Sequence, residues 1–284
     1  MLHAGGFDPE WSVVSRPREF RISMKVREPF FWVTISSGAV IMLFILVPLV
    51  EMLTAPSLTQ IMETIGDKHV VRSIRLSITT ALSAAAISFV FGTPLAYVLA
   101  RTDFRGKRLV ESIVDLPIVI PHPVIGIAIL SVAGKNHWLG MILADLGIRV
   151  MGSVTGIVIV LTFVGIPFYV NAVKAGFENI PSRLEHVSRS LGASMFSTFF
   201  RITFPLARRS VLIGFVMCTA RAISEFGAVV VVAYHPMIAP VLIYERFEAY
   251  GLKYSQPVAV WLISVCLILF LTLRILTMKS EKSP

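Results

Sequence analysis

The sequence NIPSRLEHVSRSLGASMFSTFFRITFPL, residues 179–206, is a polar segment between two long apolar runs. Pro181 is typical of a first helical turn, where its missing N–H costs no hydrogen bond. Ser182 followed three residues later by Glu185 fits a capping box, in which the two side chains bond each other's backbone N–H groups. The pattern therefore predicts the start of a short helix near residue 181.

The same segment also predicts an exposed apolar face and a turn. Leu184, Val187 and Leu191 repeat at i, i+3 and i+7, which places them on one side of a helix. Gly192 fits the position just past a helix end, where glycine adopts a positive φ at little cost. We expect a second short helix after it, with Phe196 against something apolar, so that both helices lie across one face of the protein.

Apolar runs long enough to cross about 30 Å of hydrocarbon lie on both sides of this segment. They predict an all-α polytopic membrane protein with six transmembrane helices, the first interpreted as a signal anchor. The six runs lie near residues 30–53, 76–100, 113–133, 154–173, 211–233 and 258–277.

The composition of the 284 residues supports this class: 55% are hydrophobic, 15% are charged and the mean hydropathy is +0.78. A soluble enzyme is excluded, because so few charges could not cover its surface. Lys and Arg concentrate in the N-terminal tail and after the second, fourth and last runs. The positive-inside rule then predicts a multi-pass cell-membrane protein with both termini cytoplasmic, and the net charge of +9 reports orientation, not nucleic-acid binding.

The domain organisation that we expect is simple. Residues 1–29 form a cytosolic tail, residues 30–278 a transmembrane domain with its cytoplasmic helices at about 180–204, and residues 279–284 a second cytosolic tail. The chain lacks the phosphate-binding loop G-x-x-x-x-G-K-[ST], so we expect it not to hydrolyse ATP by that route. We also expect no catalytic residue, no metal and no cofactor bound by the chain itself.

The spacing around Gly192 resembles the cytoplasmic motif of ABC importer permeases, in which E-A-A, three residues, Gly and nine residues precede I-x-L-P. Here nine residues separate Gly192 from Ile202, and Phe204-Pro205 ends the motif. The chain departs from the motif where His186-Val187-Ser188 replaces E-A-A and where Phe204 replaces Leu. The resemblance implies coupling helices that dock on an ATPase subunit, with these residues as candidates: Arg183, Leu184, Glu185, His186, Val187, Ser188, Leu191, Gly192 and Phe196.

Three further stretches narrow the resemblance, which covers about residues 70–250. FGTPLAYVLAR (91–101) is similar to the second-helix segment of type I ABC importer permeases. DLPIVIPHPVIGIAIL (115–130) and ARAISEFGAVVVVAYHPMIAPVLIYERF (220–247) resemble the molybdate/tungstate permeases, and sulfate permeases share part of the pattern. The implied protein imports a tetrahedral oxyanion by alternating access, with molybdate or tungstate expected and sulfate or another oxyanion as the alternative.

The family resemblance also implies partners. They are a second copy of the chain in a homodimer, two ATPase subunits that bind ATP-Mg at the cytoplasmic face, an external oxyanion-binding protein and membrane lipid, without nucleic acid. An intramembrane hydrolase using Ser224 with His122 or His235 is the alternative from another class, but no G-x-S-x-G context surrounds Ser224. A passive channel is a third, and it would not need the coupling segment.

Charged side chains at membrane depth are candidates for the translocation path or its gate. Arg221 and Glu225 lie four residues apart in the fifth run, and a structural ion pair is the alternative. His122 lies between Pro121 and Pro123, and with Pro117 nearby the backbone there is predicted to be broken or re-entrant.

Hydroxyl-bearing residues offer a second set of path candidates. Ser77 and Thr80 lie on one face of the second run together with Ser73, Ala84 and Ser88, and close helix packing is the alternative. Ser224 is a further candidate for the translocation path or its gate. The stretch HPMIAP (235–240) is interpreted as an external loop beside the outer mouth, a candidate gate or receptor contact.

Overall fold

The computed structural model describes residues 29–279, in which every regular element is a helix. These residues divide into two units, 1–51 and 52–284, of which the described parts are treated separately below. An all-α fold is therefore confirmed for the described part of the chain.

Helix α1 (Pro29–Thr54) accounts for the described part of the first unit. Its mean hydropathy reaches 2.4, and its 26 residues are enough to cross a membrane. The hydroxyl of Thr34 donates to the carbonyl of Phe30, 2.8 Å away, so this polar group is satisfied within the helix. The first predicted run, residues 30–53, thus corresponds to one helix.

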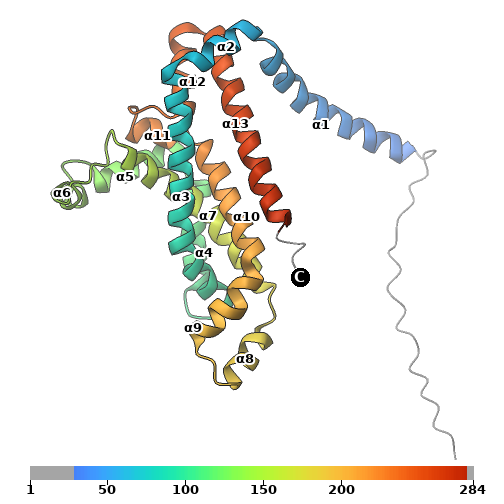
Figure 1. Ribbon diagram of the computed structural model, residues 1–284, viewed down its shortest axis with the longest axis vertical. Helices are drawn as coiled ribbons and strands as arrows, with labels where there is room; N and C mark the ends of the chain where they lie inside the picture. Colours follow the sequence, from blue (N-terminus) through green and yellow to red (C-terminus); the bar gives the residue numbers. More distant parts are fainter. Residues whose placement is uncertain (1–28, 280–284) are drawn as a thin grey trace, which may run out of the picture. The chain divides into compact units, whose positions relative to one another are not determined.

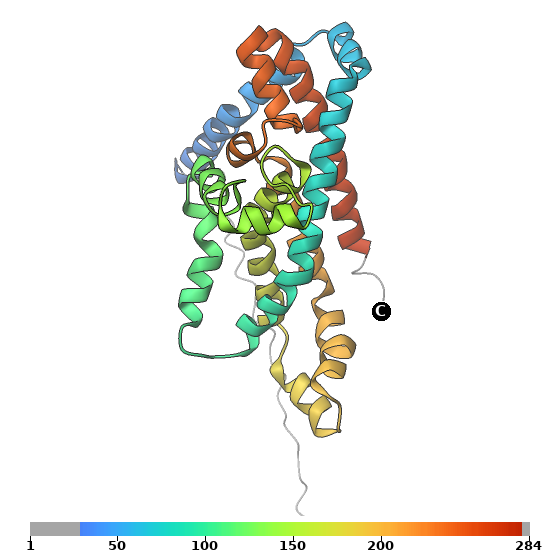
Figure 2. The same ribbon diagram turned by 90° about the vertical axis from the view of Figure 1, so that its left-hand side faces the viewer.

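The second unit is built around three long helices, α3 (Lys68–Arg101), α7 (Val154–Glu178) and α10 (Phe204–Ile223), which run side by side (Figures 1 and 2). Its remaining helices are α2 (Leu58–Gly66), α4 (Lys107–Val119), α5 (His122–Ala133), α6 (Trp138–Asp145), α8 (Ser182–Ser190), α9 (Met195–Thr198), α11 (Gly227–Val232), α12 (Ala239–Tyr250) and α13 (Leu252–Lys279).

Small residues let the central helices approach closely. A Cβ atom added at Gly165 of α7 would lie 2.7 Å from the sulfur of Cys218 on α10, and one added at Gly92 of α3 would lie 2.8 Å from the ring of Tyr169. The Tyr169 hydroxyl is in turn 2.7 Å from the hydroxyl of Thr93. Membrane helices associate through this kind of packing, because lipid supplies little hydrophobic drive between them.

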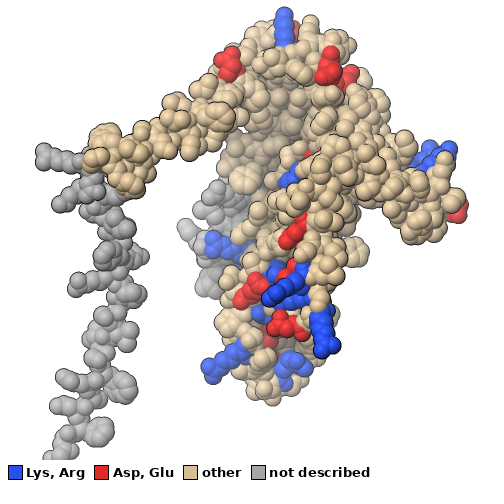
Figure 3. Space-filling view, turned by 180° about the vertical axis from the view of Figure 1, so that it is seen from behind, with Lys and Arg blue, Asp and Glu red and all other residues tan. Residues whose placement is uncertain are grey.

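Five described helices are long and apolar enough to cross a membrane, and the bent pair α4–α5 would make a sixth span. Figure 3 agrees with a membrane-spanning second unit: charged side chains gather towards the end that carries α8 and α9, and much of the surface beyond them is uncharged. The six predicted runs are each matched by one of these elements.

The break predicted at the prolines of the third run is confirmed. Helices α4 and α5 meet at an angle of 115°. Pro121 lies at the corner, and its carbonyl accepts hydrogen bonds from the N–H groups of Val124 and Ile125 at the start of α5. The corner thereby satisfies backbone groups that the bend would otherwise leave free.

One boundary prediction was wrong. The fifth run does not continue as one helix to residue 233: α10 ends at Ile223, and the short helix α11 begins only at Gly227. The predicted second short helix is α9, which passes through the π-helical residues Phe199–Thr203 into α10 as one span, Met195–Ile223. Pro205, which has no N–H, lies in the first turn of α10, directly after the π-helical residues.

Candidate functional site

The segment between α7 and α10 forms a helix, a glycine turn and a second helix, as predicted. Helix α8 ends at Ser190, and Gly192 has a φ of +89°, a conformation that side chains with a Cβ rarely adopt. The N–H of Gly192 donates to the carbonyl of Arg189, and the N–H of Ala193 donates to the carbonyl of Ser188. These bonds satisfy the last carbonyls of α8, so the turn is fixed by the backbone.

The apolar face predicted for α8 is exposed. Leu184 is 44% exposed, Val187 50% and Leu191 84%. Phe196 of α9 is 74% exposed and its ring centroid lies 4.5 Å from that of Phe200. The end of the second unit therefore presents apolar side chains that nothing in residues 29–279 covers, which is typical of an interaction surface.

The capping box predicted at Ser182 was wrong, because Glu185 takes another set of partners. The N-cap of α8 is Pro181, without a side-chain hydrogen bond. Glu185 is only 8% exposed and points away from the open surface. A carboxylate buried to this degree requires donors to replace its lost water, and α3 supplies them.

A network around Glu185 ties α8 to α3 and to the start of α10. Nε of Arg101 lies 2.8 Å from Oε1 of Glu185, and Nη2 of Arg101 donates to the carbonyl of Ile180 at 3.0 Å. The hydroxyl of Tyr97 donates to Oε2 at 3.1 Å, and that of Thr203 donates to Oε1 at 2.9 Å. These contacts hold α8 and its glycine turn in place against α3 and the start of α10.

The remaining residues of the predicted coupling set differ in their exposure to solvent. Arg183 and His186 are exposed on α8. Ser188 is partly buried, and its hydroxyl lies 3.0 Å from that of Thr198 on α9, which holds the two short helices together. Glu185 and Ser188 thus face inward, whereas the other members of the set remain accessible.

His122, Arg221 and Glu225 come together at the two breaks of the chain. Nδ1 of His122 lies 2.6 Å from Oε2 of Glu225, and Nη2 of Arg221 lies 2.8 Å from the same oxygen. Oε1 of Glu225 accepts the N–H of Ala228, 2.9 Å away. The carboxylate is fully buried, the Arg221 guanidinium and the Ala228 N–H donate to it, and the His122 ring lies in contact with both Glu225 and Arg221.

This cluster corrects the picture of two charges within one helix. Glu225 lies beyond the end of α10, in the break before α11, and its bond to Ala228 starts the new helix. His122 is the first residue of α5. The cluster therefore joins the corner between α4 and α5 to the break between α10 and α11.

The hydroxyl candidates lie elsewhere. Ser77 is 1% exposed and its Oγ accepts the N–H of Ala239 at 2.8 Å, while the Thr80 hydroxyl donates to the carbonyl of Leu76. Both positions fit the alternative of close helix packing. The hydroxyl of Ser224 donates to the carbonyl of Arg221, so the structure gives no support to a hydrolase in which Ser224 is activated by a histidine.

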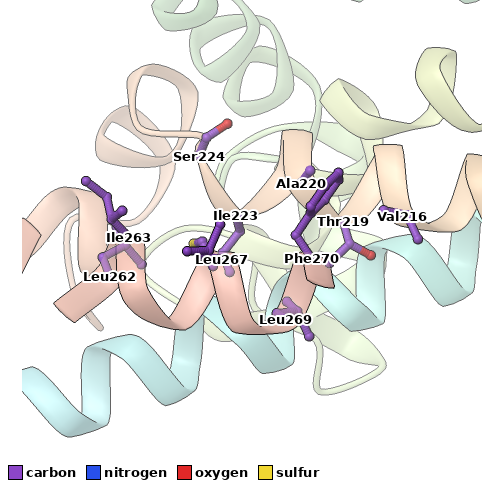
Figure 4. A pocket seen from close by; sticks show the side chains of 11 residues that line it. Val216, Thr219, Ala220, Ile223, Ser224, Leu262, Ile263, Leu267, Leu269 and Phe270 are labelled. Carbon is purple, nitrogen blue, oxygen red and sulfur yellow. The ribbon is translucent and has the colours of Figure 1, made fainter. Parts of the chain in front are cut away.

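Ser224 also lines an apolar groove of about 450 Å³ between α10 and α13 (Figure 4). The figure shows Ile223, Leu267 and Phe270 gathered in the groove. Its lining offers no charged group, and a dianion that left water there would find few donors. The groove is therefore not suited to an oxyanion.

Sequence reasoning missed three residues of the Glu185 network: Tyr97, Arg101 and Thr203. Arg101 ends the stretch FGTPLAYVLAR at the boundary of an apolar run, where a cation is common, so its pairing with a residue 84 positions away had no local signal. The short motif around Glu185 likewise suggested a helix cap, which is a local partner, instead of a distant one.

The fold and this site define the membrane subunit of an ABC importer. The chain belongs to the family described as binding-protein-dependent transport system inner membrane component, whose profile matches residues 92–279. It is an integral membrane protein and a transporter subunit, not an enzyme, since the ATPase of such systems is a separate subunit.

Known permeases are similar along most of the chain. The molybdate/tungstate transport system permease protein WtpB of Pyrococcus abyssi is 42% identical over 246 residues, which is 86% of this chain and 94% of the relative. The protein of the same description from Methanocaldococcus jannaschii is 42% identical over 82% of this chain and 91% of its own length. The sulfate transport system permease CysT of Synechocystis is 33% identical over 72% of this chain and 73% of its own length.

Solved structures confirm the type I importer fold. A chain of a bacterial ABC transporter that imports the acidic polysaccharide alginate has a TM-score of 0.69 and 15% identity, over 88% of this chain and 95% of the other. A chain of the inward-facing MetNI methionine ABC transporter has a TM-score of 0.60 and 16% identity, over 74% and 95%. The alginate transporter has also been solved with a substrate-bound periplasmic protein.

Proposed function

We propose that this permease carries molybdate and tungstate into the cytoplasm. The observation that supports the proposal is the 42% identity, over more than four fifths of the chain, to relatives described as molybdate/tungstate permeases. Sulfate is the second candidate, because the CysT permease is 33% identical over a shorter stretch. All three ions are tetrahedral dianions, so one path could be shared among them.

Two copies of the chain would form the translocation path. Two ATPase subunits would bind ATP-Mg, and their ATP hydrolysis would drive transport through it. The exposed face of Leu184, Val187, Leu191 and Phe196 is the surface on which each ATPase subunit would dock. A movement of the docked ATPase subunit would be transmitted to the membrane helices through the ion pair between Glu185 and Arg101. Both termini would lie on the ATPase side, and an external oxyanion-binding protein would dock at the opposite end.

The cluster of His122, Arg221 and Glu225 would stabilise the gate by holding two irregular segments of the chain together. It joins the α4–α5 corner to the α10–α11 break, and both places have the irregular backbone that lines cavities in membrane proteins. Glu225 neutralises Arg221, which leaves the path without a strong fixed cation at this depth. A transport site must release its ion, so weak binding there favours turnover.

Uptake by the reconstituted complex tests the substrate. Proteoliposomes would contain the permease and its ATPase, with the external binding protein and one radiolabelled oxyanion added outside. ATP-dependent molybdate uptake, competed by tungstate more strongly than by sulfate, is the expected result. Uptake of sulfate alone would replace the first candidate by the second.

A further inference from the structure

Two neighbouring cavities lie at one end of the second unit. This end carries α2 and α12 and lies away from α8 (Figure 1). The larger has a volume of about 630 Å³ and the smaller about 330 Å³. Arg72, Leu76 and Pro236 line both, so the two cavities share a wall formed by α3 and by the segment before α12.

Two arginines that line these cavities have no ion-pair partner in the described part of the chain: Arg72 lines both cavities, and Arg75 lines only the smaller one. Arg72 and Arg75 are exposed, and no carboxylate within residues 29–279 lies within ion-pair distance of either side chain. They occupy positions i and i+3 of one helix, where like charges repel each other. Arg246, which also lines the larger cavity, is by contrast paired with Asp67.

The rest of the lining favours an anion. His69 and His235 contribute imidazole rings to the larger cavity, and Glu245 is its only acidic lining residue. His69, Arg72 and Leu76 follow one another on one helix face, so the first two side chains open to the same space. Guanidinium groups present a planar fork of N–H donors that matches two oxygens of a tetrahedral oxyanion.

We infer that Arg72 and Arg75 form an entrance site that binds a tetrahedral oxyanion before it passes into the membrane path. The identity of the ion rests on the proposed function. The new element is the first site at which the permease itself binds that ion. The phosphate of a lipid headgroup offers the same chemistry, so the experiment separates a free oxyanion from a bound lipid.

The test measures equilibrium binding of radiolabelled molybdate to the permease–ATPase complex in nanodiscs, without the external binding protein, which would bind the ion itself. Nanodiscs of purely zwitterionic lipid are compared with nanodiscs that contain phosphatidylglycerol. The variants are Arg72→Gln, Arg75→Gln and the double variant. Lys253→Gln is the control, since Lys253 is an exposed cation at the same end that lines neither cavity.

Saturable binding in zwitterionic nanodiscs, displaced by tungstate and sulfate, is expected. Each single variant should weaken it on the order of tenfold, because it removes charge-assisted hydrogen bonds, and Lys253→Gln should leave it unchanged. Equal thermal midpoints of all variants would show that they fold.

Wild-type affinity in the folded double variant would overturn the inference, and so would an absence of molybdate binding in zwitterionic nanodiscs. Retention of phosphatidylglycerol that depends on the two arginines, without molybdate binding, would assign the site to lipid instead. Failure of the proposed function has a different signature, because the wild-type complex would then import no oxyanion whatever the outcome of the binding assay.

Discussion

Arg101 at the end of α3 and Glu185 in α8 form an ion pair of 2.8 Å in which both side chains are nearly buried. The pair connects a membrane-spanning helix to the short helix that presents Leu184 and Leu191 to a partner. A displacement of α8 by a docked ATPase subunit would be transmitted to α3 through this contact.

Removal of the guanidinium should destabilise the protein and uncouple it. Arg101→Met leaves the Glu185 carboxylate buried with only two hydroxyl donors, and we expect a loss of about 3 kcal/mol. Thermal unfolding of the purified complex measures the loss. The control is Lys107→Met, which breaks an exposed pair with Asp103 and should change stability by less than about 0.5 kcal/mol. Equal shifts for both variants would contradict the role given to Arg101.

The turn at Gly192 should be intolerant of a β-branched residue. Gly192→Val forces a Cβ into a φ of +89°, at a cost of about 1–3 kcal/mol, and should displace the exposed apolar face. We expect ATP hydrolysis to continue while uptake per ATP falls. Ala193→Val, one residue along and outside the positive-φ region, is the matched control. Unchanged coupling in Gly192→Val would count against the docking assignment.

The exposed apolar face should be required for assembly with the ATPase subunit. Leu191→Asp and Phe196→Asp place a carboxylate where the partner would bury a side chain, and co-purification of the ATPase should fall at least tenfold. Leu58→Asp tests specificity, since Leu58 is 81% exposed on α2. Loss of assembly in all three variants would show that an added carboxylate disrupts the permease in general, and would contradict a specific role for the face that carries Leu191 and Phe196.

The buried cluster at the two breaks predicts a rescue. Arg221→Met removes one donor from the Glu225 carboxylate and should lower stability by about 2–3 kcal/mol. Adding Glu225→Gln removes the uncompensated charge and should restore more than half of the loss. Uptake should stay impaired in the double variant, since the contact between residue 225 and His122 is altered. Normal uptake would show that the cluster contributes to stability and not to transport.

The Asp67–Arg246 pair predicts an acid-side loss of stability. Partial burial raises the pKa of Asp67, but the N–H of His69 and the Arg246 guanidinium lower it by more, so the pKa falls below its ordinary value of 3.8. A depressed pKa in the folded state stabilises the protein above the unfolded pKa, and this contribution disappears as the pH falls through the folded one. The stability gap between wild type and Asp67→Asn should be constant near pH 7 and close below about pH 4. A gap that is independent of pH would contradict this linkage.

Local patterns predicted much of the fold. The apolar runs identified the spans, the prolines around His122 the corner, and Gly192 the turn, because each depends on neighbours in the sequence. Prediction failed where a distant partner decided the outcome. Glu225 lies in a break between two helices, where its carboxylate contacts His122, 103 positions away, and accepts the N–H of Ala228.

The candidate site was predicted in part for the same reason. The accessible residues of α8 followed from periodicity, whereas the inward turn of Glu185 depends on Arg101 and Tyr97 from α3. The packing of Ser77 against the N–H of Ala239 also joins residues 162 positions apart. Such contacts leave no spacing in the sequence from which to infer them.

Molybdate uptake by proteoliposomes that contain the permease and its ATPase, supplied with the external binding protein and internal ATP, tests the central claim most directly. The account predicts ATP-dependent accumulation that is competed by tungstate, lowered per ATP hydrolysed in Gly192→Val and unchanged in Ala193→Val. Accumulation of no tetrahedral oxyanion by an assembled, ATP-hydrolysing complex would contradict it.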